Sequence, residues 1–87
     1  MDSFEIVWRN SAHHDLGNLD RQLIPRIIQA VDLLESNPFP AQCRKLRGSD
    51  RDFRIRVGDY RVVYQVDAEN RVITICHVRH RSDAYRK

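Results

Sequence analysis

Three arginines, Arg54, Arg56 and Arg61, are interspersed with apolar residues in the stretch FRIRVGDYRVVY, residues 53–64. A guanidinium group is permanently charged, and its planar fork matches two oxygens of a phosphate group. Such groups bind the backbone of RNA or DNA. They also stabilise the charge that develops on a phosphate during its transfer or cleavage. The chemistry that this stretch predicts is therefore phosphate binding or phosphodiester cleavage.

The Gly58-Asp59 step between the two apolar runs suits a two-residue hairpin turn that needs a positive φ. Such a turn places Arg56 directly opposite Arg61. Arg54 then lies on the same face, because side chains alternate along a strand and paired residues share a face. The other face is apolar and consists of Phe53, Ile55, Val57, Tyr60, Val62 and Tyr64. We expect this apolar face to pack on the core and the arginines to face solvent.

Directly opposed like charges destabilise a hairpin, so folding alone does not account for this arrangement. An anion bound between the guanidinium groups would relieve the repulsion. The alternative is that the arginines pair with nearby carboxylates, such as those of Asp50, Asp52 and Asp59, or point into water.

The charge of the chain is unevenly distributed. Residues 1–42 carry three arginines against six carboxylates, whereas residues 43–87 carry twelve basic side chains against six carboxylates. Thirteen of the fifteen basic residues are arginine, the residue suited to bidentate phosphate binding. A polyanionic partner is one interpretation of the basic half, and a merely solubilising surface is the other.

The apolar periodicity predicts a single α+β domain, residues 1–87, with the order β-α-α-β-β-β. Its second helix shows a stripe of isoleucines interrupted by Pro25, so either the regular helix starts just before Pro25 or its first turn is bent. We expect an antiparallel sheet with the two N-terminal helices packed on one face. The expected strands are 3–8, 52–57, 60–66 and 71–79, and the expected helices are 11–19 and 20–36.

Two registers are possible for the last strand. A four-residue loop would pair Val66 with Arg71 and place Ile73, Ile75 and His77 on the core face, whereas a β-bulge would reverse this. His77 is interpreted as a structural histidine.

The C-terminal sequence RHRSDAYRK brings His80, Arg81 and Tyr85 close together in the chain. A turn of helix would put Arg81 and Tyr85 on one side. Together with the arginines, these groups could cleave RNA without a metal. One group would take the proton of the ribose 2′-hydroxyl and another would protonate the leaving 5′-oxygen, giving a 2′,3′-cyclic phosphate. The alternative is an ordinary solvated tail.

Three segments resemble the RelE/ParE toxin superfamily of bacterial and archaeal toxin–antitoxin systems: KLRG (45–48), FRIRVGDYRVVYQV (53–66) and VRHRSDAYR (78–86). The resemblance implies a microbial ribonuclease-like fold and a cognate antitoxin, through which the complex would bind operator DNA. For the RelE branch it also implies endonucleolytic cleavage of mRNA on the ribosome. The unpaired spacing of the two cysteines favours a cytoplasmic protein with reduced thiols.

The resemblance also implies roles for individual residues. Arg61 and Arg81 would stabilise the transition state, and His80 and Tyr85 would transfer protons. Arg54 and Arg56 occupy positions where RelE-like toxins often carry lysine. Because arginine does not act as a base, they are assigned to binding RNA phosphates. The remaining expected RNA-binding residues are Lys45, Arg47 and Arg79.

Two other functions stay open. A ParE-like protein would poison DNA gyrase without being an enzyme, and a degenerate toxin would only bind its antitoxin. No cofactor, metal or membrane is expected. The adjacent His13 and His14 diverge on a helix, and Cys43 and Cys76 are far apart in sequence and are expected to be reduced.

Overall fold

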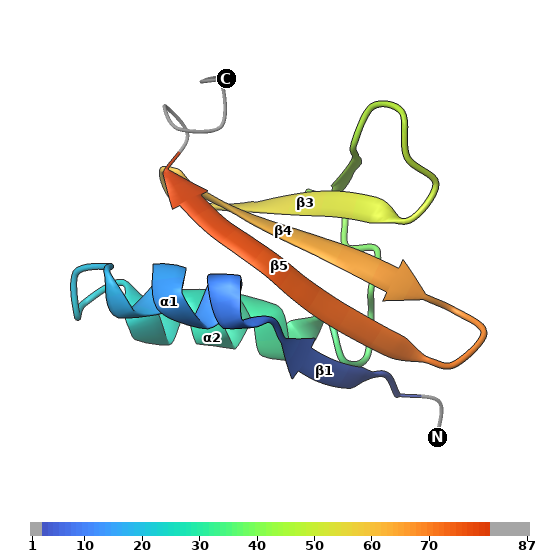
Figure 1. Cartoon of the computed structure of the whole chain (residues 1–87), viewed down its shortest axis with the longest axis horizontal. Coiled ribbons are helices and arrows are strands. Elements are labelled where there is room, and N and C mark those ends of the chain that lie inside the picture. Colours follow the sequence, from blue (N-terminus) through green and yellow to red (C-terminus); the bar gives the residue numbers. More distant parts are fainter. Residues whose placement is uncertain (1–2, 81–87) are drawn as a thin grey trace.

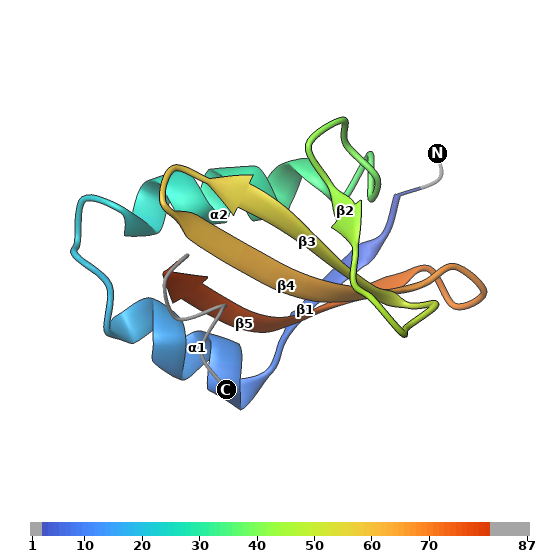
Figure 2. The same ribbon diagram turned by 90° about the horizontal axis from the view of Figure 1, so that it is seen from above.

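The fold was analysed in a computed structural model that describes residues 3–80. It has one five-stranded sheet with the strand order β1-β5-β4-β3-β2. Two helices lie against one side of the sheet (Figure 1), and Figure 2 looks onto the side that they leave open. The elements are β1 (Glu5–Trp8), α1 (Asn10–Gly17), α2 (Ile24–Leu33), β2 (Arg44–Lys45), β3 (Asp52–Val57), β4 (Tyr60–Asp67) and β5 (Val72–His80).

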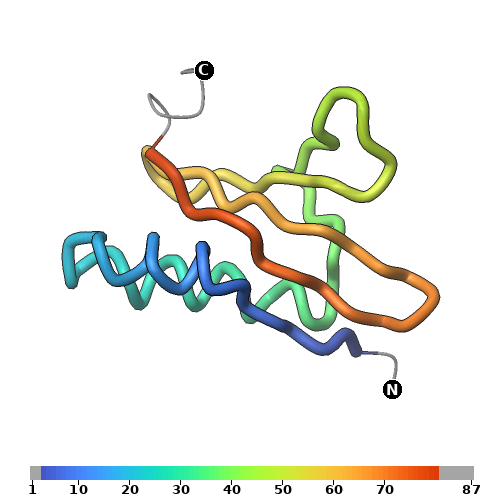
Figure 3. The backbone as a smooth tube through the Cα atoms, in the orientation of Figure 1, coloured from blue at the N-terminus to red at the C-terminus, as the bar shows by residue number. Residues whose placement is uncertain are grey.

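The sheet is mixed rather than antiparallel throughout. β1 runs parallel to β5, with Glu5 opposite Val72 and Trp8 opposite Ile75, so the first and last strands lie side by side (Figure 3). The other strand pairs are antiparallel. Alternation of residue types shows which face of a strand is buried but not which strand is its neighbour. The parallel pairing could therefore not be read from the sequence.

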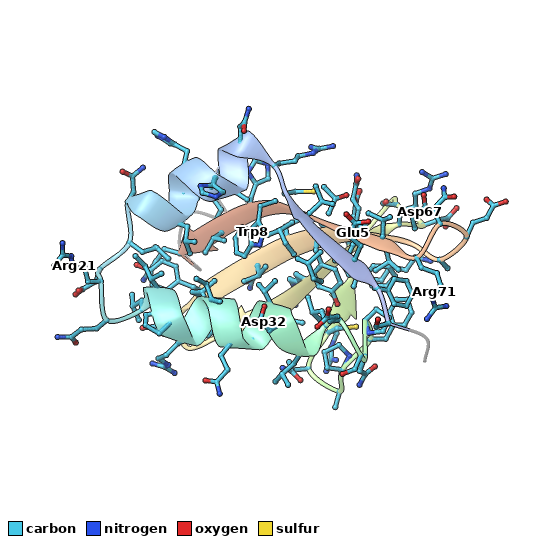
Figure 4. The ribbon with its side chains drawn as sticks, turned by 90° about the horizontal axis from the view of Figure 1, so that it is seen from below. Glu5, Trp8, Arg21, Asp32, Asp67 and Arg71 are labelled. Atoms are coloured by element: carbon cyan, nitrogen blue, oxygen red, sulfur yellow. The ribbon has the colours of Figure 1, made fainter. Side chains whose placement is uncertain are left out.

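Both helices form within or close to their expected ranges, but both are shorter than expected. Regular α2 begins at Ile24, which confirms the first of the two alternatives for Pro25. Proline is tolerated in the first turn of a helix because the amide hydrogen that it lacks has no acceptor there. Figure 4 shows the side of the sheet that carries the helices, with Asp32 of α2 and Trp8 of β1 labelled.

The core lies between the helices and the apolar face of the sheet. Ile27, Val31 and Leu34 contribute from the helical layer. The strands contribute the fully buried Ile55, Val62, Tyr64, Ile73 and Ile75. The buried Tyr64 also donates a hydrogen bond from its hydroxyl to the carbonyl of Pro38 at 2.8 Å, which ties the segment after α2 to the sheet. The sheet is thus packed on one side, and no helix among residues 3–80 covers its other side.

None of the helices described is long and apolar enough to cross a membrane.

Candidate nucleic-acid interface

The hairpin of β3 and β4 has the predicted register. Val57 pairs with Tyr60 across the turn, and Arg56 lies directly opposite Arg61. Gly58 has a φ of +61°, as the tight turn requires. Arg61 is in turn opposite Arg79 on β5, so three arginines follow one another across three adjacent strands. This "arginine row", Arg56–Arg61–Arg79, lies on the side of the sheet opposite the helices.

Arg61 is buried rather than exposed, with only 8% of its surface accessible, and the expectation that it faces solvent is wrong. β4 is the middle strand, so Arg56 and Arg79 flank Arg61 on both sides, while they themselves stay exposed. Charges interact more strongly where solvent is excluded. An anion at the centre of the row would therefore be attracted more strongly than one at its ends.

A β-bulge in β5 determines which histidine joins this surface. The register shifts between Val63 and Tyr64, so that Tyr64 pairs with Ile75 but Val63 pairs with His77. Ile73 and Ile75 face the core as expected, whereas His77 lies on the side of the arginine row. Its ring nitrogen Nδ1 is 3.3 Å from Nη2 of Arg79. Of the two registers that the sequence left open for this strand, the one with a bulge therefore applies to His77 and turns it away from the core.

His80 lies on the other side of the sheet. It is opposite Tyr60, and the two rings meet edge to face with centroids 5.2 Å apart. Together with α1 they border a hollow of about 500 Å³, lined by Asp15, Asn18, Leu19, Tyr60, Val78, Arg79 and His80. The structure thus does not bring the imidazole of His80 onto the face that carries Arg61. Arg81 and Tyr85 lie outside the described residues.

Asp15, on α1, connects that helix to the end of β5. Its Oδ2 accepts a hydrogen bond from the amide of Val78 at 3.1 Å. The same oxygen is 3.6 Å from Nδ1 of His77 and 3.7 Å from Nε of Arg79. Sequence reasoning missed this residue, because nothing local in a helix indicates a contact with a strand 63 residues later.

The short strand β2 adds a further arginine. Arg44 is directly opposite Arg54, which places both on the same face as the arginine row. Gln42, Arg44, Arg54 and Arg56 line a hollow of about 260 Å³. We call the six residues Arg44, Arg54, Arg56, Arg61, His77 and Arg79 the arginine face.

The other two expected RNA-binding residues lie apart from it. Lys45 is opposite Phe53 and therefore belongs to the other side of the sheet, where its Nζ is 3.5 Å from Asp50. Arg47 is exposed in the loop that follows β2.

The site contains no grouping of metal ligands among residues 3–80, where no three His, Cys, Asp or Glu side chains come together. Both cysteines are unpaired, as expected. Burial raises the pKa of the Cys76 thiol, which makes it a poor nucleophile. The chemistry available on the arginine face is thus that of guanidinium and imidazole groups.

Comparison with known proteins gives consistent similarities. Residues 6–85 match the family model described as ParE toxin of type II toxin–antitoxin system. The toxin named RelE1 of Methanocaldococcus jannaschii is 32% identical over 75 residues, covering 83% of each chain. Toxin RelG of Mycobacterium tuberculosis is 27% identical over 85 residues, covering 97% of this chain and 98% of the other. In the crystal structure of the archaeal RelE–RelB complex from Pyrococcus horikoshii, the matching chain superposes with a TM-score of 0.81 at 28% identity, covering 91% of this chain and 96% of that one.

Proposed function

Because this chain belongs to the RelE/ParE superfamily and is a toxin of a type II toxin–antitoxin system, we propose that it is an endoribonuclease that cleaves mRNA on the ribosome. The observation that carries the proposal is the arginine row, with the buried Arg61 at its centre. A row of like charges has no use in folding, but it matches a phosphodiester whose negative charge increases during cleavage.

In the proposed reaction the ribose 2′-oxygen attacks the adjacent phosphorus and the 5′-oxygen leaves. Arg61 binds the two non-bridging oxygens, and Arg56 and Arg79 bind from either side. The resemblance alone assigns Arg81 to stabilising the negative charge of the transition state and Tyr85 to proton transfer. Arg54, Lys45 and Arg47 would hold flanking RNA. The reaction needs no cofactor.

A histidine of the arginine face is better placed for proton transfer than His80. Nδ1 of His77 is 3.3 Å from Nη2 of Arg79, and in one of the two neutral tautomers of the ring it accepts a hydrogen bond from that group. The proton of the neutral ring is then on Nε2, from which it can be donated to the leaving 5′-oxygen. We therefore propose His77 as a proton donor beside the earlier candidates His80 and Tyr85.

We also propose that a cognate antitoxin neutralises the protein. Similar toxins were crystallised in complexes described as RelE–RelB, RelBE2 and RelBE. The basic second half of this chain suits an acidic antitoxin segment that becomes ordered on binding. Binding of the complex to operator DNA would occur through the antitoxin.

The second candidate function is ParE-like poisoning of DNA gyrase. It is favoured by the family model, which describes ParE toxins. Poisoning of gyrase also requires no acid–base pair on the toxin. Its predicted outcome in cells differs: mRNA stays intact while gyrase–DNA breaks accumulate. The degenerate toxin is a third outcome, in which expression without antitoxin leaves growth normal.

The test is expression of the protein without antitoxin, followed by primer extension on a reporter mRNA. We expect discrete cuts with the wild type and a loss of cutting of at least about a hundred-fold for Arg61→Ala, the size typical for loss of a preorganised charge-stabilising group. His77→Gln and His80→Gln form a matched pair that compares the two candidate proton donors; His77→Gln should reduce cutting by about a hundred-fold and His80→Gln by less. Arg21→Ala, in the exposed connection of α1 and α2, is the control (Figure 4). Cutting by Arg61→Ala at the wild-type rate would contradict the proposal.

A further inference from the structure

The side of the sheet that the helices leave open (Figure 2) carries a second polar row beyond the arginine face. Asp52, Gln65 and Thr74 lie directly opposite one another on β3, β4 and β5. Gln65 points to the same side as Arg61, because an even number of residues separates them on β4. We propose that this "amide row", Asp52–Gln65–Thr74, binds the edge of one RNA base and so determines which sequences are cleaved. The inference rests on the proposed function, to which it adds a base preference.

The amide row borders a hollow that shares no residue with the arginine face. The hollow has a volume of about 120 Å³ and is lined by Arg51, Gln65, Val66, Asp67, Val72 and Thr74. A hollow of this size admits one flat group rather than a folded partner. It therefore suits a single base that has turned away from its neighbours in a single strand, which is how proteins commonly read RNA sequence.

The polar atoms of Gln65 and Thr74 are available to such a base. Both side chains are half-buried, and within residues 3–80 neither the Gln65 amide nor the Thr74 hydroxyl makes a hydrogen bond. A ligand that completes these hydrogen bonds stabilises groups that are otherwise partly removed from water without a partner. The carboxylate of Asp67, by contrast, accepts from the backbone amide of Asn70 at 3.1 Å and from its Nδ2 at 2.9 Å. It is thus engaged within its own loop.

The chemistry of the amide row suits a base and not a phosphate. The row contains no cation, and the carboxylate of Asp52 at its β3 end would repel a phosphate. The amide of Gln65 presents a donor beside an acceptor, which pairs with the amino group and the adjacent ring nitrogen of adenine. Asp52 accepts from an amino group, and the hydroxyl of Thr74 can donate or accept. The preferred base is therefore adenine rather than uracil, which has no amino group.

Arg51 is the cation that borders the hollow, and its position fits stacking rather than charge attraction. It is exposed and lies in the bend before β3. Its charge and that of Asp67 together leave the lining of the hollow without net charge, unlike the arginine face. Guanidinium planes stack on unpaired RNA bases. Arg51 would thus cover a base whose edge is held by Gln65 and Thr74.

The amide row lies close enough to Arg61 for one RNA strand to contact both. Gln65 is four residues beyond Arg61 on β4, which amounts to about 13 Å. Between them Val63 adds an apolar surface on the same side, since it is opposite Arg54. The base that is read therefore belongs to a nucleotide near the cleaved bond and not at it.

The binding test uses fluorescent oligouridylates with 2′-O-methyl groups, which cannot be cleaved. One contains uridine alone, and the others carry a single adenosine at successive positions. For the wild type we expect adenosine at one position to increase the affinity by about ten-fold, the size typical of a bidentate contact with a base. Gln65→Met keeps the length of the side chain without its amide and should bring this ratio close to one. Thr74→Val exchanges the hydroxyl for a methyl group and should lower the ratio by up to about five-fold.

Two controls separate base recognition from general RNA binding. Gln29→Met removes an identical amide from the exposed face of α2, on the other side of the sheet (Figure 1), and should leave the ratio unchanged. Arg61→Ala should weaken the binding of every oligonucleotide alike, because it removes a contact with phosphate. Thermal unfolding of each variant shows whether the fold is kept, and Thr74→Val tests the row independently of Gln65→Met.

The positions of the cuts in the primer-extension assay give a second readout. Sites cut by the wild type should share an adenine at one fixed distance from the cut, and Gln65→Met should also cut sites that lack it. Equal binding of all the RNAs by the wild type, or a ratio unchanged in Gln65→Met, overturns the base-reading site, and the cuts alone then decide the nuclease function. If the wild type cuts mRNA without binding the free oligonucleotides, the sequences of the cut sites decide. A wild type that neither binds RNA nor cuts it overturns both proposals.

Discussion

Replacing Asp15 by alanine should destabilise the protein through the backbone of β5. β1 ends at Trp8, opposite Ile75, so the later residues of β5 have no strand on that side. There the Asp15 carboxylate accepts the hydrogen bond of the Val78 amide at 3.1 Å. The carboxylate side chain is only 19% exposed, so water has limited access to the amide once this acceptor is removed.

The magnitude follows from that one contact. A buried donor left without an acceptor costs about 1–3 kcal/mol, and the interaction with the half-exposed Arg79 adds at most about 1 kcal/mol. We expect Asp15→Ala to lower the free energy of unfolding by about 2 kcal/mol. For a domain of this size that corresponds to a decrease of roughly 8–16 °C in Tm. Asp15→Asn keeps an oxygen acceptor and should lose less than about 1 kcal/mol.

The assay is urea unfolding followed by circular dichroism, with wild type, Asp15→Asn and Asp15→Ala side by side. Equal destabilisation of the two variants would mean that the carboxylate charge matters and the acceptor does not. A loss below about 0.5 kcal/mol in Asp15→Ala would refute the reasoning, because the Val78 amide would then have found another partner.

Three other predictions concern the hairpin turn, the core and the thiols. Gly58→Ala should cost about 1–2 kcal/mol, because φ at this position is +61°; chemical denaturation measures it, and an unchanged midpoint would show that the turn rearranges. Burial raises the pKa of Tyr64, so its phenol ionises more readily in the unfolded chain than in the folded protein. As far as this group is concerned, the free energy of unfolding should be constant below about pH 10 and fall above it. Tyr64→Phe should reduce that fall by up to about 1.4 kcal/mol per pH unit. With a thiol reagent, the partly exposed Cys43 should react quickly and the buried Cys76 slowly; two equal rates would contradict the burial of Cys76 in solution.

The parts of the fold governed by neighbouring residues could be predicted from the sequence. The Gly58-Asp59 turn determines the register of β3 and β4, and so the pairing of Arg56 with Arg61. The isoleucine stripe identified the helical face that packs on the sheet. Both depend on alternation or periodicity over a few residues, which the sequence displays directly.

The parts governed by distant contacts could not. The bulge that moves His77 onto the arginine face leaves no mark on the alternation of β5, where either register was possible. Arg44 came to the site through β2, a strand too short to give a pattern. The burial of Arg61 depends on having a strand on each side, which only the order of the strands reveals. The sequence therefore indicated an arginine-rich interface, but not the full set of residues that form it.

The parallel pairing of the first and last strands has a consequence for the time at which the protein becomes active. Residues 5–8 cannot find their partners until residues 72–75 have been synthesised, and Arg79 joins its row only with the same final strand. A nascent chain from which β5 has not yet emerged therefore lacks a finished sheet and a complete set of guanidinium groups. Contacts between such distant segments also form slowly, which leaves an interval after the synthesis of β5 in which an inhibitor could capture the chain before it does harm.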